Sequence, residues 1–152
     1  MSISGRLHEL GYELPKIAAP VANYVSTRRA GSYLFVSGQV SGPAFVGRLG
    51  AELDVAAGRE AAERAALNLL AQVAAATDGS LAAVAGVLRL GVFVAATPDF
   101  TEHPQVANGA SDLLVAVFGD AGRHARAAVG VASLPGGSAV EIDAILLLGA
   151  DR

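Results

Sequence analysis

The sequence predicts an α+β domain in which two helices pack on one face of a mixed β-sheet, in the order ββαβαββ. Two observations support this prediction. Residues 62–73 repeat apolar side chains at intervals of three and four, which is typical of a helix with one buried face. Residues 86–96 and two runs within 124–148 are short, apolar and rich in β-branched residues, which is typical of strands. We expect residues 1–152 to form one domain, because this length is usual for a single domain.

The first third of the chain carries the weakest signals. Residues 1–20 are expected to be an irregular segment with a short helix over Ser4–Leu10. Two short strands, Tyr24–Arg28 and Tyr33–Ser37, follow as a hairpin, because an Ala-Gly pair separates them. The glycine-rich loop over residues 41–53 shows no period, so it is not assigned to a helix or strand.

The remaining elements are better marked. A helix is expected from an N-cap at Asp54 to about Thr77, followed by a strand over Gly86–Ala96 that is buried on both faces. A second helix is expected over Pro104–Phe118. The last two strands lie within residues 124–148, on either side of a Leu-Pro-Gly-Gly turn, and are expected to fold back on one another as a hairpin.

Composition limits both assembly and partners. Hydrophobic residues make up 53% of the chain and charged residues 16%, against roughly 25% charged in an ordinary soluble domain. A domain this small cannot bury so much apolar surface alone, so we expect a homo-oligomer. The net charge of −3 supplies no basic field for nucleic acid, so no nucleic-acid partner is expected.

The residue inventory excludes several kinds of site. The chain has no cysteine, which rules out disulfides, thiolate metal sites and a cysteine nucleophile. His103 and His124 have no carboxylate at a metal-ligand spacing, so neither a metal nor another cofactor is expected. The polar N-terminal run lacks the apolar core of a secretory signal, and no apolar run approaches the ~20 residues that cross a bilayer. A cytoplasmic protein without a membrane partner is therefore expected.

Arg126 opens the first of the last two strands. Alternate strand residues share a face, which places Arg126 beside Ala128 and Gly130, whose small side chains leave room next to the guanidinium. This arrangement suits a shallow pocket that binds a carboxylate through two hydrogen bonds. Alternatively, Arg126 ends a strand and extends into solvent, which the residue pattern alone favours.

Glu141 and Asp143 give the last strand one acidic face. A solvated sheet face explains both residues, and we keep that interpretation for Asp143. Glu141 has a second possible role, as a base that positions a water molecule. In a simple hairpin Arg126 and Glu141 would lie ~17 Å apart at the usual strand rise. Either they serve different purposes, or one site is assembled across a subunit boundary.

Four patches of the sequence resemble the YjgF/RidA family of reactive-intermediate deaminases, also called L-PSP endoribonucleases. The segment ARAAVGVASLPGGSAVEIDA is similar to the family signature, with fifteen residues from Arg126 to Glu141 as in the deaminase branch. NYVSTRRAGSYLFVSGQV is similar to the N-terminal hairpin, which places Tyr24 and Ser37 at ligand-site positions. VANGASDLL places Asn108 at the family asparagine, and RLGVFVAATPDF is similar to the central strand and its exit.

The resemblance implies a chorismate-mutase-like fold and a homotrimer with clefts between subunits. It also implies hydrolysis of 2-imino or 2-enamino acids, which are small carboxylate substrates, to 2-keto acids and ammonia. Arg126 would bind the substrate carboxylate, and Glu141 would activate water and relay protons. Backbone groups near Ala128, together with Tyr24, Asn108 and Ser37, would complete the pocket.

The sequence departs from the family pattern at several places. Ala128 stands where the best-known members have cysteine, the loop over residues 41–53 is longer, and His124 precedes the arginine. These features resemble a longer, chorismate-mutase-like subgroup. Two alternatives to the deaminase remain: a module that binds small carboxylates in the same cleft without chemistry, and a ribonuclease. The acidic balance and scarcity of Lys and Arg rank the ribonuclease last.

Overall fold

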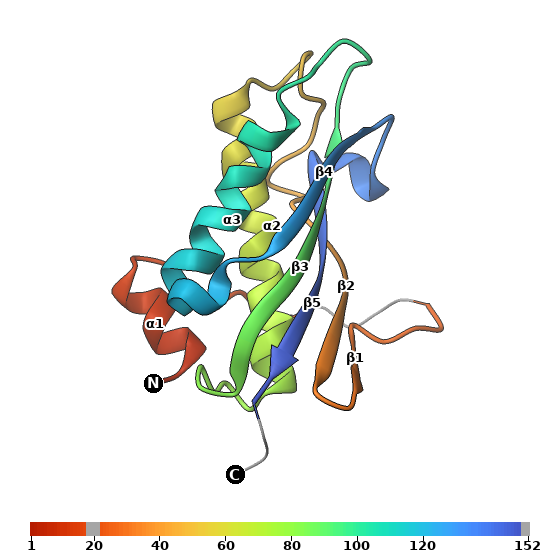
Figure 1. Ribbon diagram of the computed structural model, residues 1–152. Helices are drawn as coiled ribbons and strands as arrows, with labels where there is room; N and C mark the ends of the chain where they lie inside the picture. The colour runs from red at the N-terminus through yellow and green to blue at the C-terminus, as the bar shows by residue number, and fades with distance from the viewer. Residues whose placement is uncertain (18–21, 150–152) are drawn as a thin grey trace.

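Helices and sheet form two layers (Figure 1). The computed structural model describes residues 1–17 and 22–149. Its elements are α1 (Ile3–Glu9), β1 (Thr27–Ala30), β2 (Tyr33–Val40), α2 (Val55–Ala76), β3 (Val84–Ala95), α3 (His103–Phe118), β4 (Ala125–Val131) and β5 (Val140–Leu148), with 3-10 turns at Gly119–Gly122 and Pro135–Gly137. The predicted order and the two helices on one sheet face are confirmed, and α1 corresponds to the expected short helix. Residues 18–20 of the expected irregular segment lie outside the described residues.

The helix α2 begins and ends where the sequence indicates. Asp54 is its N-cap, and its Oδ1 accepts a hydrogen bond from the Ala57 amide at 2.8 Å. At the other end the Thr77 hydroxyl donates to the Val73 carbonyl at 2.8 Å. Asp78 and Gly79 then adopt positive φ angles, which turn the chain away from the helix axis.

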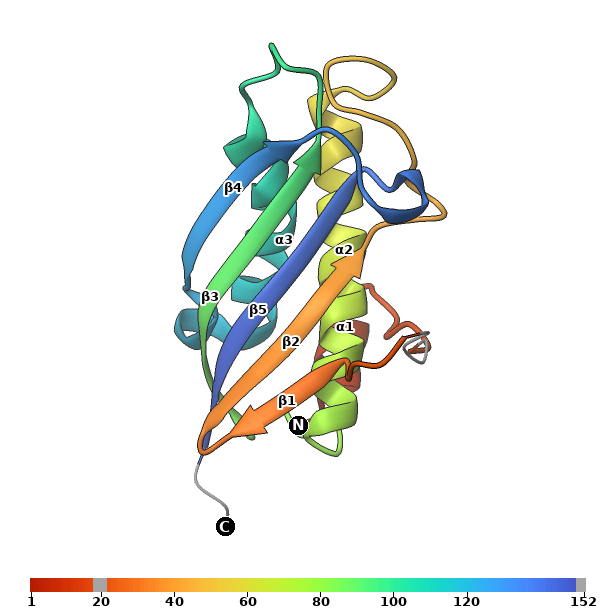
Figure 2. The ribbon, with the colours of Figure 1, turned by 90° about the vertical axis from the view of Figure 1, so that its right-hand side faces the viewer.

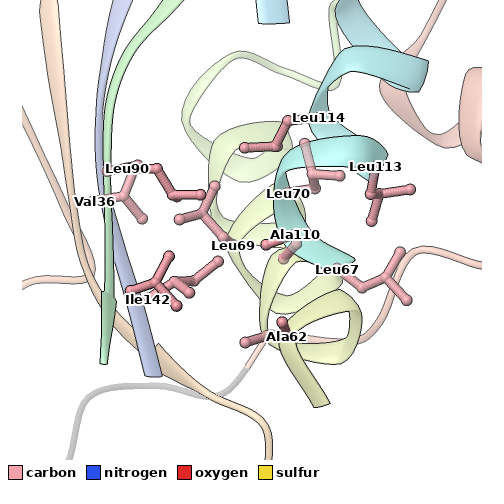
Figure 3. Close-up of a cluster of buried hydrophobic side chains, with 14 of the residues drawn as sticks. Val36, Ala62, Leu67, Leu69, Leu70, Leu90, Ala110, Leu113, Leu114 and Ile142 are labelled. Carbon is pink, nitrogen blue, oxygen red and sulfur yellow. The ribbon is translucent and has the colours of Figure 1, made fainter. Parts of the chain in front are cut away.

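The hydrophobic core lies between the sheet and the two long helices (Figure 3). Leucines of α2 and α3 face strand residues such as Leu90 and Ile142, and all of these side chains are buried. Much of the α2 face is alanine, which lets its backbone lie close to its neighbours; the buried alanines are Ala61, Ala62, Ala65, Ala66, Ala71 and Ala74. Among residues 1–17 and 22–149, no helix is long and apolar enough to span a membrane.

The strand order is β1-β2-β5-β3-β4, so the predicted hairpin of the last two strands is wrong. Strand β3 lies between β4 and β5, pairing parallel with β4 and antiparallel with β5. The physical reason is α3, which packs on the sheet between β3 and β4 and so acts as the crossover of a parallel pair (Figure 2). The Leu-Pro-Gly-Gly segment reverses the chain direction, but β5 then pairs with the far edge of β3 and not with β4.

Two strand predictions need correction. The first strand begins at Thr27, so Tyr24 lies before it rather than within it. Strand β3 is buried on both faces only in its second half, because Leu88 and Arg89 in its first half are exposed. The predicted two-sided burial therefore holds for Leu90–Val92 and fails before them.

In Figure 2 the helices lie behind the sheet, and the opposite face of the sheet is turned toward the viewer. Tyr33, Phe35 and Val129 are 50%, 43% and 47% exposed on it. Single exposed apolar residues are ordinary, but several on one sheet face indicate a surface suited to association.

Candidate functional site

Arg126 lies on the helix-facing side of the edge strand β4. Its register partner in β3 is Leu90, which points into the core. Its Nη1 donates hydrogen bonds to Asn108 Oδ1 at 2.8 Å and to Ser111 Oγ at 3.1 Å, and Nη2 donates to the Pro104 carbonyl at 3.5 Å. The interpretation in which Arg126 simply extends into solvent is therefore wrong, because α3 holds the guanidinium in one place.

These bonds leave one edge of the guanidinium available. The two hydrogens of Nη1 are directed at Asn108 and Ser111. Within the part of the chain that the structure describes, Nε makes no hydrogen bond, and Nη2 makes only the long one to Pro104. The Nε and Nη2 hydrogens point in parallel and match the two oxygens of a carboxylate. This edge of Arg126 therefore has the donor geometry that a carboxylate requires.

The strand beside Arg126 carries small residues on the same face. Ala128 is partly buried against the core, and Gly130 lies beneath the His103 ring, since a Cβ there would fall 2.6 Å from His103 Nε2. His103 packs edge-on against Phe100, with ring centroids 5.2 Å apart. Both rings line an open hollow of about 370 Å³ together with Gly130. This hollow, with its aromatic walls, therefore lies near the start of α3, next to Pro104.

Glu141 lies on the opposite face of the sheet, on β5. It covers Gly38, where a Cβ would fall 2.6 Å from Glu141 Oε1, so a larger residue would displace this carboxylate. Burial raises the pKa of Glu141 above its ordinary value, and the nearby Asp143 charge raises it further. Asp143 itself is half exposed and pairs with Arg89 at 3.6 Å. A raised pKa brings the Glu141 carboxyl closer to what a general base needs near neutral pH.

Ser37 and Tyr24 lie toward the β1–β2 side of the sheet, away from Arg126 on the opposite edge strand β4. Ser37 adjoins Gly38, and its hydroxyl donates to the Val25 carbonyl at 2.8 Å, which ties the segment carrying Tyr24 to β2. Tyr24 is 56% exposed and lines a hollow of about 280 Å³ with Gly38 and Gln39. The hollow lies beyond the N-terminal end of β1, whose register with β2 covers Tyr33–Val36, and Asn68 and Gln72 of α2 also line it.

The predicted site residues therefore form two groups on one chain. The first group, on β4 and α3, comprises Arg126, Asn108 and Ala128. The second group comprises Glu141 on β5, Ser37 on β2 and Tyr24, which precedes β1. Across the sheet, Arg126 is in register with Ala144 and Glu141 with Val129. Arg126 and Glu141 are therefore separated by two strand spacings and three residues, about 10 Å in each direction, and face opposite sides of the sheet.

Comparison with known proteins places the chain in a family. Residues 4–144 match the family described as "YjgF/chorismate mutase-like, putative endoribonuclease". The chain belongs to this family. The chorismate-mutase-like YjgF/RidA fold expected from the four sequence patches is thereby confirmed.

Similar proteins of this YjgF family extend over nearly the whole chain. Protein TCP17 of Trypanosoma cruzi is 50% identical over 151 residues, which cover 96% of this chain and 94% of TCP17. The crystal structure of Atu1372, a protein of unknown function from Agrobacterium tumefaciens, is 48% identical, with a TM-score of 0.90 over 97% of this chain and 92% of that one. The YjgF gene product of E. coli is 29% identical, with a TM-score of 0.61 over 87% and 93%.

Sequence reasoning missed two members of the first group in this YjgF-family protein. Ser111 accepts a hydrogen bond from Arg126, and its hydroxyl also lies 2.9 Å from His124 Nε2. The signal was present: Asn108 and Ser111 are three residues apart on one helix face, and His124 and Arg126 are two apart on one strand side. Only the packing of α3 on β4 shows that these two pairs meet.

Proposed function

We propose that this protein hydrolyses reactive 2-imino acids, and the 2-enamino acids that tautomerise to them, to 2-keto acids and ammonia. The observation that carries the proposal is the Arg126 guanidinium, which α3 holds with its Nε and Nη2 edge available. Membership of the YjgF family supports a related function. This edge would bind the carboxylate of the substrate, and the resemblance to the deaminase branch of the family implies the imine or enamine group.

Arg126 would act by orientation. A guanidinium is always charged, and a carboxylate held by two parallel hydrogen bonds keeps one fixed plane. The imine carbon is bonded directly to that carboxylate, so its position is fixed as well. Holding the reacting carbon beside a bound water converts a bimolecular encounter into a step within one complex, which lowers the entropic part of the barrier.

Glu141 would act on the water. As a general base it takes a proton from the water while the water oxygen bonds to the imine carbon and the electron pair of the double bond moves to nitrogen. Glu141 passes this proton to nitrogen, so the tetrahedral carbon carries a hydroxyl and an amino group. Glu141 then takes the hydroxyl proton and delivers it to the amino group as the carbon–nitrogen bond breaks and the 2-keto acid forms. Ammonia leaves, and one water is consumed for each substrate. The raised pKa of Glu141 suits both halves of this proton transfer.

The site would be assembled between copies of the chain. Arg126 and Glu141 face opposite sides of one sheet, so a single chain cannot bring both to one small molecule. The open apolar face around Phe35 and Val129 offers a surface by which copies associate. A homotrimer with three such clefts, which the resemblance to the family implies, fits both features.

Keto-acid release tests the reaction. With 2-aminoacrylate generated in situ, pyruvate should form faster with the wild-type protein than in buffer. Arg126→Ala should abolish the acceleration, and Arg126→Lys should restore little, because an ammonium cannot reproduce the planar pair of donors. Equal rates for Arg126→Ala and wild type would contradict the proposal. RNA cleavage that requires Arg126 or Glu141 would support a ribonuclease in its place.

Mixed oligomers test the assembly. Arg126→Ala and Glu141→Gln chains are each expected to be inactive, but a mixed oligomer contains interfaces with both wild-type side chains. Random mixing of equal amounts should restore about a quarter of the wild-type rate if one site takes one residue from each of two chains. If both residues acted within one chain, mixing after dissociation and reassociation would restore no activity.

One observation favours a second candidate, the binding of small carboxylates without turnover. The anchor of Arg126 is complete within one chain, whereas Glu141 lies on the far face of the sheet. Titration calorimetry separates the two functions. A binding module would bind a 2-keto acid only when Arg126 is present. Its Glu141→Gln variant would bind the acid as tightly as wild type does, and neither protein would form product.

A further inference from the structure

His124 and Ser111 extend the anchor of Arg126 into a chain of three hydrogen bonds. Arg126 Nη1 lies 3.1 Å from Ser111 Oγ, and Ser111 Oγ lies 2.9 Å from His124 Nε2. The other ring nitrogen, Nδ1, lies 2.6 Å from the Gly122 carbonyl oxygen. Gly122 is buried at the end of the 3-10 turn. The series of hydrogen bonds therefore ends on a buried backbone carbonyl.

The direction of each bond follows from what its ends can do. A carbonyl oxygen only accepts, so His124 Nδ1 carries the ring proton. A guanidinium only donates, so the Ser111 oxygen accepts from Arg126, and the single proton of its hydroxyl is directed to His124 Nε2. In a neutral ring protonated at Nδ1, Nε2 is the acceptor that this arrangement needs. One tautomer of His124 therefore satisfies all three bonds.

We propose that His124, acting through Ser111, is a positioning residue that sets the orientation of the Arg126 guanidinium. This inference rests on the proposed function, because it concerns the group that binds the substrate carboxylate. With Nε2 as acceptor, the Ser111 hydroxyl has its proton directed away from Arg126 and its lone pairs toward it. Without that acceptor the hydroxyl is free to rotate, and Nη1 keeps only Asn108 as a fixed partner.

Two substitutions of His124 separate its nitrogens. In His124→Gln the amide oxygen lies where Nε2 was, so the acceptor for Ser111 is kept and the bond to Gly122 is lost. In His124→Asn the amide nitrogen lies where Nδ1 was, so the bond to Gly122 is kept and the acceptor for Ser111 is lost. Each variant loses one hydrogen bond, so a merely structural role predicts similar effects of the two.

Calorimetric titration with 2-oxobutyrate measures the guanidinium without requiring turnover. We expect His124→Asn and Ser111→Ala to weaken 2-oxobutyrate binding by about tenfold or more, because small displacements of a binding group are costly. His124→Gln should stay within about threefold of wild type, since it keeps the acceptor for Ser111. The double variant Ser111→Ala/His124→Asn should bind no more weakly than either single one, because both remove the same link.

A tautomer measurement provides a second readout. In nitrogen-edited NMR at pH 8, where an ordinary imidazole is neutral, the His124 proton should reside on Nδ1. A proton on Nε2 would overturn the proposal. Equal losses of 2-oxobutyrate binding in His124→Gln and His124→Asn would also overturn it, as would wild-type binding by His124→Asn.

Failure of this proposal is distinguishable from failure of the proposed function. If wild type binds 2-oxobutyrate through Arg126 but forms no product from 2-aminoacrylate, the deaminase proposal fails and the positioning role of His124 stands. If wild type turns over substrate and the two His124 variants behave alike, the positioning role fails and the deaminase stands. If Arg126→Ala binds 2-oxobutyrate as tightly as wild type does, both are overturned.

Discussion

The two long helices approach one another closely at Gly109, and Gly109→Ala tests how tightly they pack there. Gly109 is buried in α3 against the backbone of α2. A Cβ added there would lie 2.8 Å from the Arg59 carbonyl carbon and 3.0 Å from its Cα, with the carbonyl oxygen closer still. Ordinary contacts begin at 3.4 Å. Because the obstacle is backbone, no side-chain rotation relieves it, and the helices must separate.

Two opposing effects set the size of the loss. Alanine is favoured over glycine within a helix by about 1 kcal/mol. Inserting a methyl group into a packed interior typically costs 1–3 kcal/mol, and backbone obstruction places this site at about the upper limit. A gap of 0.5–1 Å would also weaken the neighbouring dispersion contacts by roughly a quarter to a half. We expect a net destabilisation of about 2 kcal/mol, or a Tm lower by roughly 4–8 °C in a chain of this size.

Urea denaturation followed by circular dichroism measures the effect, with Gly86→Ala as the matched control. A Cβ at Gly86 meets nothing nearer than the Ala121 carbonyl oxygen at 3.6 Å, so this variant should remain close to wild type or gain up to about 1 kcal/mol. A Gly109→Ala protein as stable as wild type would refute the reasoning, because the helices would then have room that the structure does not show.

Three further predictions concern stability. The pKa of Glu141 is raised in the folded state, so the stability that this carboxyl contributes is full below its unfolded pKa near 4.5 and is lost as pH rises through the folded pKa. Glu141→Gln should therefore be more stable than wild type at pH 7 but not at pH 4. Equal differences in stability at the two pH values would contradict this. Asp54→Ala should cost about 1 kcal/mol in urea unfolding and Asp54→Ser much less, because serine still caps the helix. Leu70→Ala should cost about 2–5 kcal/mol, since its fully buried side chain would leave a cavity, and a loss below 1 kcal/mol would show that the core closes over it.

Local signals predicted the helices well. Asp54, the three- and four-residue repeat and the Asp78-Gly79 turn all act within a few residues of one another, so the bounds of α2 followed from sequence. The path of β5 did not. A turn after Leu134 specifies a reversal of the chain, but it does not specify which strand the next one pairs with. The pairing of β5 depends on the packing of α3, which places β4 beside the other edge of β3.

In the candidate site, too, the sequence predicted the local arrangement of residues but not the contacts between distant elements. Strand alternation correctly placed Arg126 with Ala128 and gave β5 a separate acidic side carrying Glu141. It could not show that the two sides face opposite ways in the folded sheet, because that depends on the inserted strand β3. Nor could it show that Ser111 meets Arg126, which requires the rotation of α3 about its axis.

The buried alanines of α2 should tolerate substitution differently from most residues in a protein interior. An alanine has no rotamer freedom to lose when it is buried, so this helix is immobilised at little entropic cost. In most cores, truncation is the harmful change, and saturation mutagenesis selects for bulk. Along α2 we expect the opposite selection: serine and glycine should survive at positions such as Ala62 and Ala66, whereas valine and leucine should be purged.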